Sequence, residues 1–290
     1  MLETLKVTNW SGPFDVTLRA RAAAQLEAGS VLLFPGLGFA LDEAEQAVLR
    51  AAGSDGAHKN VSLDPDTGCC QGSILAGDAL TALARVLQRY ANATIDLVLG
   101  LAPHYQAGLT RGRTSFRPIE IATRATSWRH DDKRLHVDAF PTHPQRGRRI
   151  LRVFANVDPS GMSRVWRLGP PFESVAAKFL PSLPRRVPGQ AWLLDQLGLT
   201  RGRRSRYDEI MLHLHDAAKR DLAWQQSAAV EEIVFPPGSV WLVFTDQVPH
   251  AALSGRNALE QTLHVTPEVL AEPAQGPLAV LERMCGWPLC

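Results

Sequence analysis

Several features that the sequence lacks narrow the class of protein. Its longest apolar runs are far shorter than the roughly 20 residues that a membrane-spanning helix needs. The first residues, MLETLK, include no cationic region followed by an apolar stretch, so we expect no secretory signal and a cytosolic location. The four cysteines, of which two are adjacent, do not have the spacing of a disulfide framework. These absences argue against a membrane-spanning protein and against a small disulfide-rich secreted protein.

The chain also has little net charge. Lysine and arginine total 31 and the acidic residues 29, which gives a formal net charge of +2. An excess of this size does not by itself indicate nucleic-acid binding, and we expect no nucleic-acid partner. There is no internal repeat and no long low-complexity segment. The distribution of the basic residues is therefore more informative than their number.

The length and the hydrophobic content indicate one sizeable folded unit. The chain has 290 residues, of which 45% are hydrophobic. Barrels and sandwiches of this size occur as single domains. We therefore predict one catalytic domain over 1–290, with a helix-rich N-terminal portion at 1–117 and a β-rich core at 118–290 that carries an insert at 170–229.

Hydrophobic periodicity supports this division. Apolar residues recur at helical spacing in the N-terminal portion, whereas the second portion has short apolar segments between Pro, Gly and Asn turns. The predicted helices are 16–28, 41–52, 78–99 and 207–220. The predicted strands are 30–34, 119–123, 135–138, 150–157, 165–168, 231–235, 239–244, 248–253 and 260–265, and 53–77 is predicted to be a loop. Pro-Gly turns between short apolar strands favour an α+β fold built on a double-stranded β-helix, or jelly-roll barrel, with flanking helices that are mainly N-terminal.

The motif His136-Val137-Asp138, followed far along the chain by His250, indicates a metal site. Residues i and i+2 of a strand point to the same face, so His136 and Asp138 can bind one ion together. His250 follows a Pro-Gly turn and the apolar segment 240–244. Two histidines and one carboxylate on one face of the metal are the ligand set of non-haem Fe(II) oxygenases. We predict that His136, Asp138 and His250 bind Fe(II).

Such a site leaves coordination positions for a bidentate co-substrate and for O2. Enzymes of this kind usually bind 2-oxoglutarate, whose distal carboxylate needs a cation inside the barrel. Arginine suits that role because its planar guanidinium binds a carboxylate with two hydrogen bonds. Arg152, flanked by apolar residues, is the first candidate, and Arg256, six residues after His250, is the competing one. The alternative for Arg152 is a purely structural arginine with a buried partner.

Basic segments lie on both sides of the His-x-Asp motif. Arg129 precedes the motif, and Arg146, Arg148 and Arg149 follow it, while a third basic run occupies 201–206 in the insert. Charge runs are usually solvated surface. Because two of these runs flank the predicted site, we predict that Arg129, Arg146, Arg148 and Arg149 contact an anionic substrate.

Another cluster of potential ligands lies in the insert. His213, His215 and Asp216 also alternate ligand types, but their neighbours predict a helix, in which residues i and i+2 diverge. We therefore expect these side chains to lie on a solvated helix face.

The segments around these residues resemble the bacterial hydroxylases of 3-deoxy-D-manno-octulosonic acid (Kdo). The resemblance covers about the C-terminal two-thirds of the chain and is carried by the segments 127–129, 135–141, 149–157, 164–169, 245–252 and 259–263. It implies an Fe(II)- and 2-oxoglutarate-dependent dioxygenase that hydroxylates C3 of the Kdo sugar on Kdo-lipid A of lipopolysaccharide. It also implies a place at the cytoplasmic face of the inner membrane, with peripheral membrane contact. By this resemblance His136, Asp138 and His250 bind iron, and Arg152 binds 2-oxoglutarate.

Several alternatives stay open from the sequence alone. The barrel could belong to a cupin-like metal enzyme without 2-oxoglutarate, to a dioxygenase that repairs nucleic acid or acts on a different anionic substrate, or to a non-enzymatic glycan-binding protein. The C-terminal stretch 278–289 could contact a membrane or could be a helix that docks on the barrel.

Overall fold

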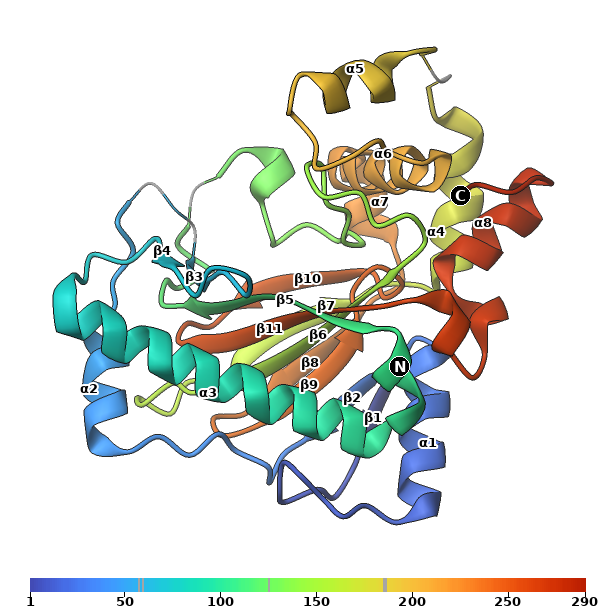
Figure 1. Cartoon of the computed structure of the whole chain (residues 1–290). Coiled ribbons are helices and arrows are strands. Elements are labelled where there is room, and N and C mark those ends of the chain that lie inside the picture. Colours follow the sequence, from blue (N-terminus) through green and yellow to red (C-terminus); the bar gives the residue numbers. More distant parts are fainter. Residues whose placement is uncertain (57, 59, 125, 185–186) are drawn as a thin grey trace.

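Two β-sheets lie at the centre of the protein (Figure 1). The computed structural model describes residues 1–290 apart from positions 57, 59, 125, 185 and 186. The large sheet has the strand order β1-β2-β9-β6-β11-β5-β3-β4, and the small sheet has the order β10-β7-β8. The strands are β1 (Leu2–Thr4), β2 (Val31–Phe34), β3 (Val61–Leu63), β4 (Cys70–Gln71), β5 (Leu109–Arg117), β6 (Arg149–Asn156), β7 (Arg164–Leu168), β8 (Glu231–Phe235), β9 (Val240–Phe244), β10 (His250–Ser254) and β11 (Ala258–Val265).

The strands from β6 onward follow the double-stranded β-helix pattern, which confirms the predicted jelly-roll fold. The chain passes from β6 in the large sheet to β7 and β8 in the small one, then to β9, back to β10, and finally to β11. The sheets remain two separate hydrogen-bonded sheets and do not close into a continuous barrel. Side chains on their facing surfaces therefore surround the space between them.

Only part of that space is filled by an apolar core. Trp166 and Phe235 of the small sheet pack against Phe154 and Trp241 of the large sheet. The rings of Phe235 and Trp241 are stacked with centroids 4.1 Å apart. Beyond this aromatic core the inner face of the large sheet becomes polar, and that change marks the position of the functional site.

Helices cover the outer face of the large sheet (Figure 1). They are α1 (Val16–Glu27), α2 (Glu43–Ala51) and α3 (Gly77–Leu101). The long helix α3 buries an apolar stripe that includes Leu83, Leu87 and Leu97, as the helical periodicity predicts. Tyr90 on the same helix donates a hydrogen bond of 3.0 Å to the carbonyl oxygen of Val153 on β6. These contacts fix β6, and with it the site on its other face.

A second group of helices packs on the segment that carries the His-x-Asp motif. It comprises α4 (Phe172–Phe179), α6 (Arg206–Arg220), α7 (Leu222–Ser227) and α8 (Pro277–Cys285), whereas α5 (Gln190–Gln196) projects beyond this group. Leu135 and Val137 are buried in the apolar cluster formed by this group. Because side chains alternate along an extended segment, burial of these two turns His136 and Asp138 to the opposite face.

Two sequence-based expectations need correction. The predicted loop at 53–77 contains two strands, β3 and β4. The helix-rich first 117 residues thus contribute five strands, β1 to β5, to the large sheet. The predicted strand at 119–123 is wrong, because the strand here is β5, which pairs with β11 and ends at Arg117 before Pro118. In the described part of the chain, no helix has both the length and the apolar character needed to cross a bilayer.

Candidate metal centre

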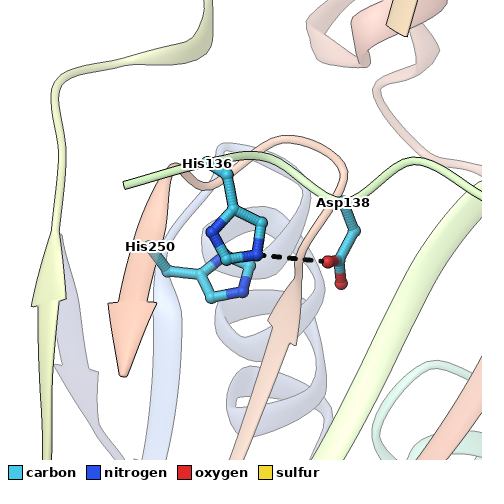
Figure 2. A group of neighbouring side chains, drawn as sticks. All are labelled: His136, Asp138 and His250. Carbon is cyan, nitrogen blue, oxygen red and sulfur yellow. Dashed lines mark ion pairs between the residues drawn. The ribbon is translucent and has the colours of Figure 1, made fainter. Parts of the chain in front are cut away.

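His136, Asp138 and His250 converge at one end of the small sheet (Figure 2). His136 forms a β-bridge with His250, with N–H···O distances of 3.1 and 2.9 Å between their backbones. The backbone N–H of Asp138 donates to the carbonyl oxygen of Thr245 at 2.8 Å. Backbone pairing between His136 and His250, which are 114 positions apart in the sequence, therefore joins the two halves of the motif. The structure brings the three predicted ligands together.

The geometry of these side chains suits a metal ion. One ligand atom from each residue lies within 4.8 Å of the others, and His136 Nε2 is 3.7 Å from Asp138 Oδ1. His136 Nδ1 lies 2.7 Å from the carbonyl oxygen of Arg134, and His250 Nδ1 lies 2.9 Å from that of Val248. A carbonyl can only accept, so both Nδ1 atoms carry the proton and both Nε2 atoms keep a free lone pair.

The protonation states also suit a metal ion. Burial, followed by the charge of the other histidine, lowers the pKa of His136 well below its usual value, and burial lowers the pKa of His250. Burial opposes ionisation of Asp138, but Arg152 and the histidines outweigh that effect and lower the pKa of the carboxyl. The site therefore presents two neutral imidazoles and one carboxylate. Oδ2 of Asp138 is buried and lacks a hydrogen-bond partner, which fits an ion as the missing partner.

The triad lies in the wall of a cavity of about 750 Å³ between the two sheets and α6. Phe154, Trp166 and three arginines, Arg117, Arg152 and Arg164, line its inner part. The indole of Trp166 stacks on the imidazole of His250 with ring centroids 5.1 Å apart. A cavity of this size can accept small carboxylates beside a metal.

Arg152 lies where its sequence context predicts, pointing into this cavity from β6. Its Nε is 3.0 Å from Asp138 Oδ2, and its Nη1 is 2.9 Å from Oε1 of Glu260 on β11. Arg117 of β5 forms an ion pair with the other oxygen of the same Glu260. One buried carboxylate therefore holds two guanidiniums at the cavity wall.

Arg164, at the start of β7, is a cavity residue that sequence reasoning missed. It is fully buried, and among the described residues no carboxylate lies within ion-pair distance of its guanidinium. The hydrogen bond that its side chain makes within the described structure goes to the carbonyl oxygen of Gly255 at 3.3 Å. Burial and the nearby Arg117 lower its pKa to about 9. Arg164 Nε and Trp166 Nε1 are both buried donors without acceptors. Two unsatisfied donors in the wall of a cavity indicate a ligand that accepts hydrogen bonds.

Arg256 does not lie in the metal cavity, so the structure contradicts its prediction as a co-substrate ligand. Its Nε bonds Asp158 at 3.2 Å, and its Nη2 lies 3.4 Å from the hydroxyl of Ser160. The turn between β10 and β11 carries Arg256 away from the site, since Asn257 there adopts a positive φ of 50°.

The predicted substrate arginines divide into two groups. Arg129 lines the outer part of the metal cavity, where its Nε pairs with Asp216 at 3.0 Å. Arg146 and Arg148 do not line that cavity, because they bond carbonyl oxygens of Arg203 and Gln145.

Arg149 contradicts its predicted role most directly. It is only 1% exposed, its Nε pairs with Asp246 at 2.7 Å, and its Nη2 donates to Gln247 at 2.6 Å. Arg149 is the first residue of β6 and its side chain packs over the ring of Phe244. It stabilises the sheet from the side opposite to the cavity.

The histidines of α6 also differ from expectation. His213, His215 and Asp216 line the metal cavity instead of a solvated helix face, and the rings of His215 and His136 have centroids 5.3 Å apart. Helix α6 lies across the cavity mouth, which helical periodicity alone cannot reveal. These residues lie next to the metal triad, without joining the cluster of ligand atoms.

Comparison with known proteins agrees with this geometry. A family model described as 3-deoxy-D-manno-oct-2-ulosonic acid (Kdo) hydroxylase matches residues 10–288. A solved structure of the Kdo hydroxylase KdoO, a non-haem Fe(II) α-ketoglutarate-dependent dioxygenase in complex with α-ketoglutarate and Fe(III), is 42% identical, with a TM-score of 0.94 over 99% of this chain and 97% of that chain. A structure of KdoO with cobalt(II) has a TM-score of 0.95 at the same identity and coverage. No match was found among curated protein sequences. With its His-Asp-His centre, its jelly-roll sheets and this match over nearly its whole length, the chain belongs to the Kdo hydroxylase family.

Proposed function

We propose that this protein is an Fe(II)- and 2-oxoglutarate-dependent dioxygenase that hydroxylates C3 of the Kdo sugar on Kdo-lipid A. The observation that carries the proposal is the convergence of His136, Asp138 and His250 beside a cavity lined by arginines, in a member of this family. Strands from both ends of the chain share the large sheet, which supports one catalytic domain over 1–290.

In this proposal the triad binds Fe(II) through His136 Nε2, His250 Nε2 and a carboxylate oxygen of Asp138. When bound, the ferrous ion with 2-oxoglutarate and O2 supplies the oxidising power for hydroxylation of an unactivated C–H bond. The protein holds the imidazoles in the metal-binding tautomer through the carbonyl oxygens of Arg134 and Val248. Its remaining task is to orient two anionic ligands and exclude water.

We assign the distal carboxylate of 2-oxoglutarate first to Arg164. Arg117 and Arg152 already share Glu260, whereas Arg164 has no carboxylate partner within ion-pair distance in the described structure. Trp166 Nε1 offers a further unsatisfied donor in the same wall. Arg152, the residue suggested by sequence, would assist from β6 and would counter the charge of Asp138 until a metal binds. Guanidiniums suit this role because they bind carboxylates with geometric specificity.

The acceptor sugar would enter from the side of α6. That side of the cavity is lined by Arg129, His215 and Lys219. The positive charges of Arg129 and Lys219 suit the carboxylate of Kdo. The Arg152 side chain is only 13% exposed and lines the cavity, which counts against the cupin-like alternative without 2-oxoglutarate, since that alternative would leave this arginine on the surface. A different anionic acceptor remains the second candidate, because the same cations would serve any small sugar acid.

The test is a reaction of purified protein with Fe(II), 2-oxoglutarate, ascorbate and Kdo-lipid A, followed by measurement of succinate and lipid mass. The proposal predicts one added oxygen on the Kdo unit and loss of this product in His136→Ala. Succinate formation without oxidation of the lipid would keep the dioxygenase and reject the acceptor. Neither product from protein that binds iron would reject both.

We also propose peripheral contact with the inner membrane, at its cytoplasmic face, through α5 and the residues around it. Figure 1 shows α5 projecting from the body above α6. Five large apolar side chains are exposed here, namely Val187, Trp192, Leu193, Leu197 and Leu199. Arg203 follows them on the surface, and Gln190 and Arg204 line the metal cavity. Exposed Trp and Leu beside arginines are typical of segments that bind anionic lipid surfaces.

The C-terminal stretch is a weaker candidate for this contact. Helix α8 buries Val280 and Leu281 against the cluster that includes residues of α4 and α6, so it docks on the body of the protein. The apolar residues of α5, by contrast, are the densest exposed group in the described chain.

Sedimentation with lipid vesicles tests the contact without any turnover. The protein should bind vesicles that contain phosphatidylglycerol, and Leu193→Ser/Leu197→Ser should reduce that binding at least several-fold. The control Val230→Ser/Val234→Ser changes two apolar residues that are similarly exposed elsewhere. Equal vesicle binding by both variants, or self-association of the wild type that only the α5 variant abolishes, would overturn the membrane assignment.

A further inference from the structure

A second cavity, of about 620 Å³, adjoins the metal cavity along the inner face of the large sheet. It lies over β3, β5 and β11, and none of the residues that line it belongs to the small sheet. Arg117, Phe140 and Arg152 line both cavities, so they share a wall. We call this second cavity the β5 trough. A ligand bound at the metal could extend into it.

The β5 trough carries an excess of positive charge. The arginines that line it are Arg111, Arg113, Arg117, Arg152 and Arg201, and the carboxylates are Asp64, Asp66 and Glu260. Glu260 is paired with Arg117 and Arg152, Asp64 approaches Arg113 at 3.9 Å, and Asp66 is exposed.

Arg111 and Arg201 consequently have no acidic partner within ion-pair distance among the described residues. Nε of Arg111 is buried and lacks a hydrogen-bond partner, while its Nη2 bonds the hydroxyl of Thr114 at 3.2 Å. Burial lowers the pKa of Arg111 without an opposing carboxylate. The buried, unsatisfied Nε of Arg111 therefore favours a ligand that accepts hydrogen bonds, and the unpaired charge favours an anion.

A bulge in β5 brings Arg111 and Arg113 into the same trough. In the pairing with β11, Arg111 lies opposite Leu263 and Thr114 opposite Gln261, so two residues of β5 face one residue of β11. Gly112 occupies this bulge, where a Cβ would lie only 3.0 Å from the carbonyl oxygen of Thr262. Bulges redirect side chains, and here Arg111 and Arg113 both line the trough.

Two histidines show the same positive environment. Burial, and then Arg148 and Arg152, lower the pKa of His264 to about 4. Burial, and then Arg201 and Arg113, lower the pKa of His143. Nδ1 of His264 is buried without a hydrogen-bond partner. A neutral His264 can therefore offer a hydrogen bond to a ligand that the arginines hold.

We propose that the β5 trough is an anion subsite in which Arg111, Arg113 and Arg201 bind a phosphate monoester carried by the acceptor. Guanidiniums from β5 and from the loop before α6 line it, and a tetrahedral group with three terminal oxygens can satisfy several such donors at once. The identity of the acceptor rests on the proposed function, whereas the affinity of the trough for phosphate does not. The trough then holds the part of the glycolipid beyond the sugar that is hydroxylated.

Steady-state kinetics with two acceptors test this proposal. Arg111→Gln/Arg201→Gln should raise KM for Kdo-lipid A about tenfold or more, because the charge-assisted hydrogen bonds from both guanidiniums to the phosphate are lost. It should leave kcat unchanged, and it should have no effect on an acceptor from which phosphatase has removed the phosphates. Arg167→Gln is the matched control, because Arg167 is half-exposed on β7 and lies outside both cavities.

An equal rise in KM for the phosphorylated and the dephosphorylated acceptor would overturn the phosphate assignment. An increased KM for 2-oxoglutarate alone would also overturn it. Circular dichroism checks that the double variant folds, and Arg111→Lys/Arg201→Lys should restore part of the affinity by restoring charge.

A binding measurement separates this proposal from the proposed function. Metal-free protein saturated with 2-oxoglutarate is titrated with inorganic phosphate by calorimetry. Binding by the wild type and by Arg167→Gln, with loss in the double variant, supports the subsite even if no acceptor is hydroxylated. Hydroxylation of Kdo-lipid A by protein that shows no phosphate binding, and no difference between the acceptors, would remove the subsite and keep the proposed function.

Discussion

Arg152 Nε lies 3.0 Å from Oδ2 of Asp138, yet the two atoms are not aligned for a hydrogen bond. The guanidinium of Arg152 therefore acts as a counter-charge to the carboxylate, and the oxygen remains available to a metal. Arg152 is itself held by Glu260 at 2.9 Å, so it does not depend on Asp138 for its position.

This relationship predicts a metal-dependent stability effect for Arg152→Gln. Without metal, the substitution leaves Asp138 buried without its cation, and loss of one partner of a buried ion pair costs about 3–5 kcal/mol. A bound divalent ion replaces that charge, so the destabilisation should be much smaller with Co(II). Thermal unfolding of both proteins with and without Co(II) measures the difference. Equal destabilisation in both states would show that Arg152 does not serve as the counter-charge.

Arg164→Gln should raise KM for 2-oxoglutarate by roughly tenfold to a hundredfold, because a charged hydrogen bond to the distal carboxylate is lost. Arg167→Gln changes an exposed arginine on the same strand and should leave KM within twofold, on the order of the small effects of surface substitutions. Initial rates of succinate formation at varied 2-oxoglutarate provide the measurement. If Arg164→Gln kept the wild-type KM, the distal carboxylate would lie elsewhere.

Arg149→Gln should lower stability and spare substrate binding. The change leaves Asp246 buried beside Gln247 without its cation, for which a loss of about 3–5 kcal/mol is expected. Chemical denaturation measures this loss, and KM for Kdo-lipid A at a temperature where the variant is folded should stay unchanged. A large rise in KM with normal stability would instead indicate that Arg149 contacts the substrate.

Acid should destabilise the protein in part through His264. The folded pKa of this residue is about 4, below the value of an unfolded histidine, so between these values the unfolded chain binds a proton that the folded chain does not. Stability contributed by neutral His264 is therefore present near neutral pH and is lost as the pH falls. His264→Gln should reduce the pH dependence by up to about 1.4 kcal/mol per pH unit between about pH 6 and pH 5. The free energy of unfolding is measured against pH for the metal-free wild type and His264→Gln. An equal fall in the two proteins over this range would contradict the assignment.

The clustering of His136 with Asp138 could be predicted from the sequence because their geometry is local. The i, i+2 spacing of His136 and Asp138 fixes their common face, and the burial of Val137 enforces it. The helices and most strands of the second half likewise follow from hydrophobic periodicity. The position of His250 depends on pairing between distant strands, and only the order of turn and strand indicated it.

The positions of the arginines could not be predicted in this way. Arg117, Arg152 and Arg164 lie on three strands, and their convergence depends on sheet register and on which sheet each strand joins. Arg149 lies in a basic run that reads as surface, although it is buried against Asp246. The trough arginines, Arg111 and Arg113, owe their placement to a bulge at Gly112, which a single sequence does not reveal.

The most direct test of the central claim is to run the reaction under heavy-oxygen gas and locate the label. An Fe(II)/2-oxoglutarate hydroxylase should place one labelled oxygen atom on the Kdo sugar and one in succinate for each 2-oxoglutarate consumed, and His250→Ala should form neither product. Label in succinate with an unlabelled, unmodified sugar would contradict the claim that Kdo is the acceptor.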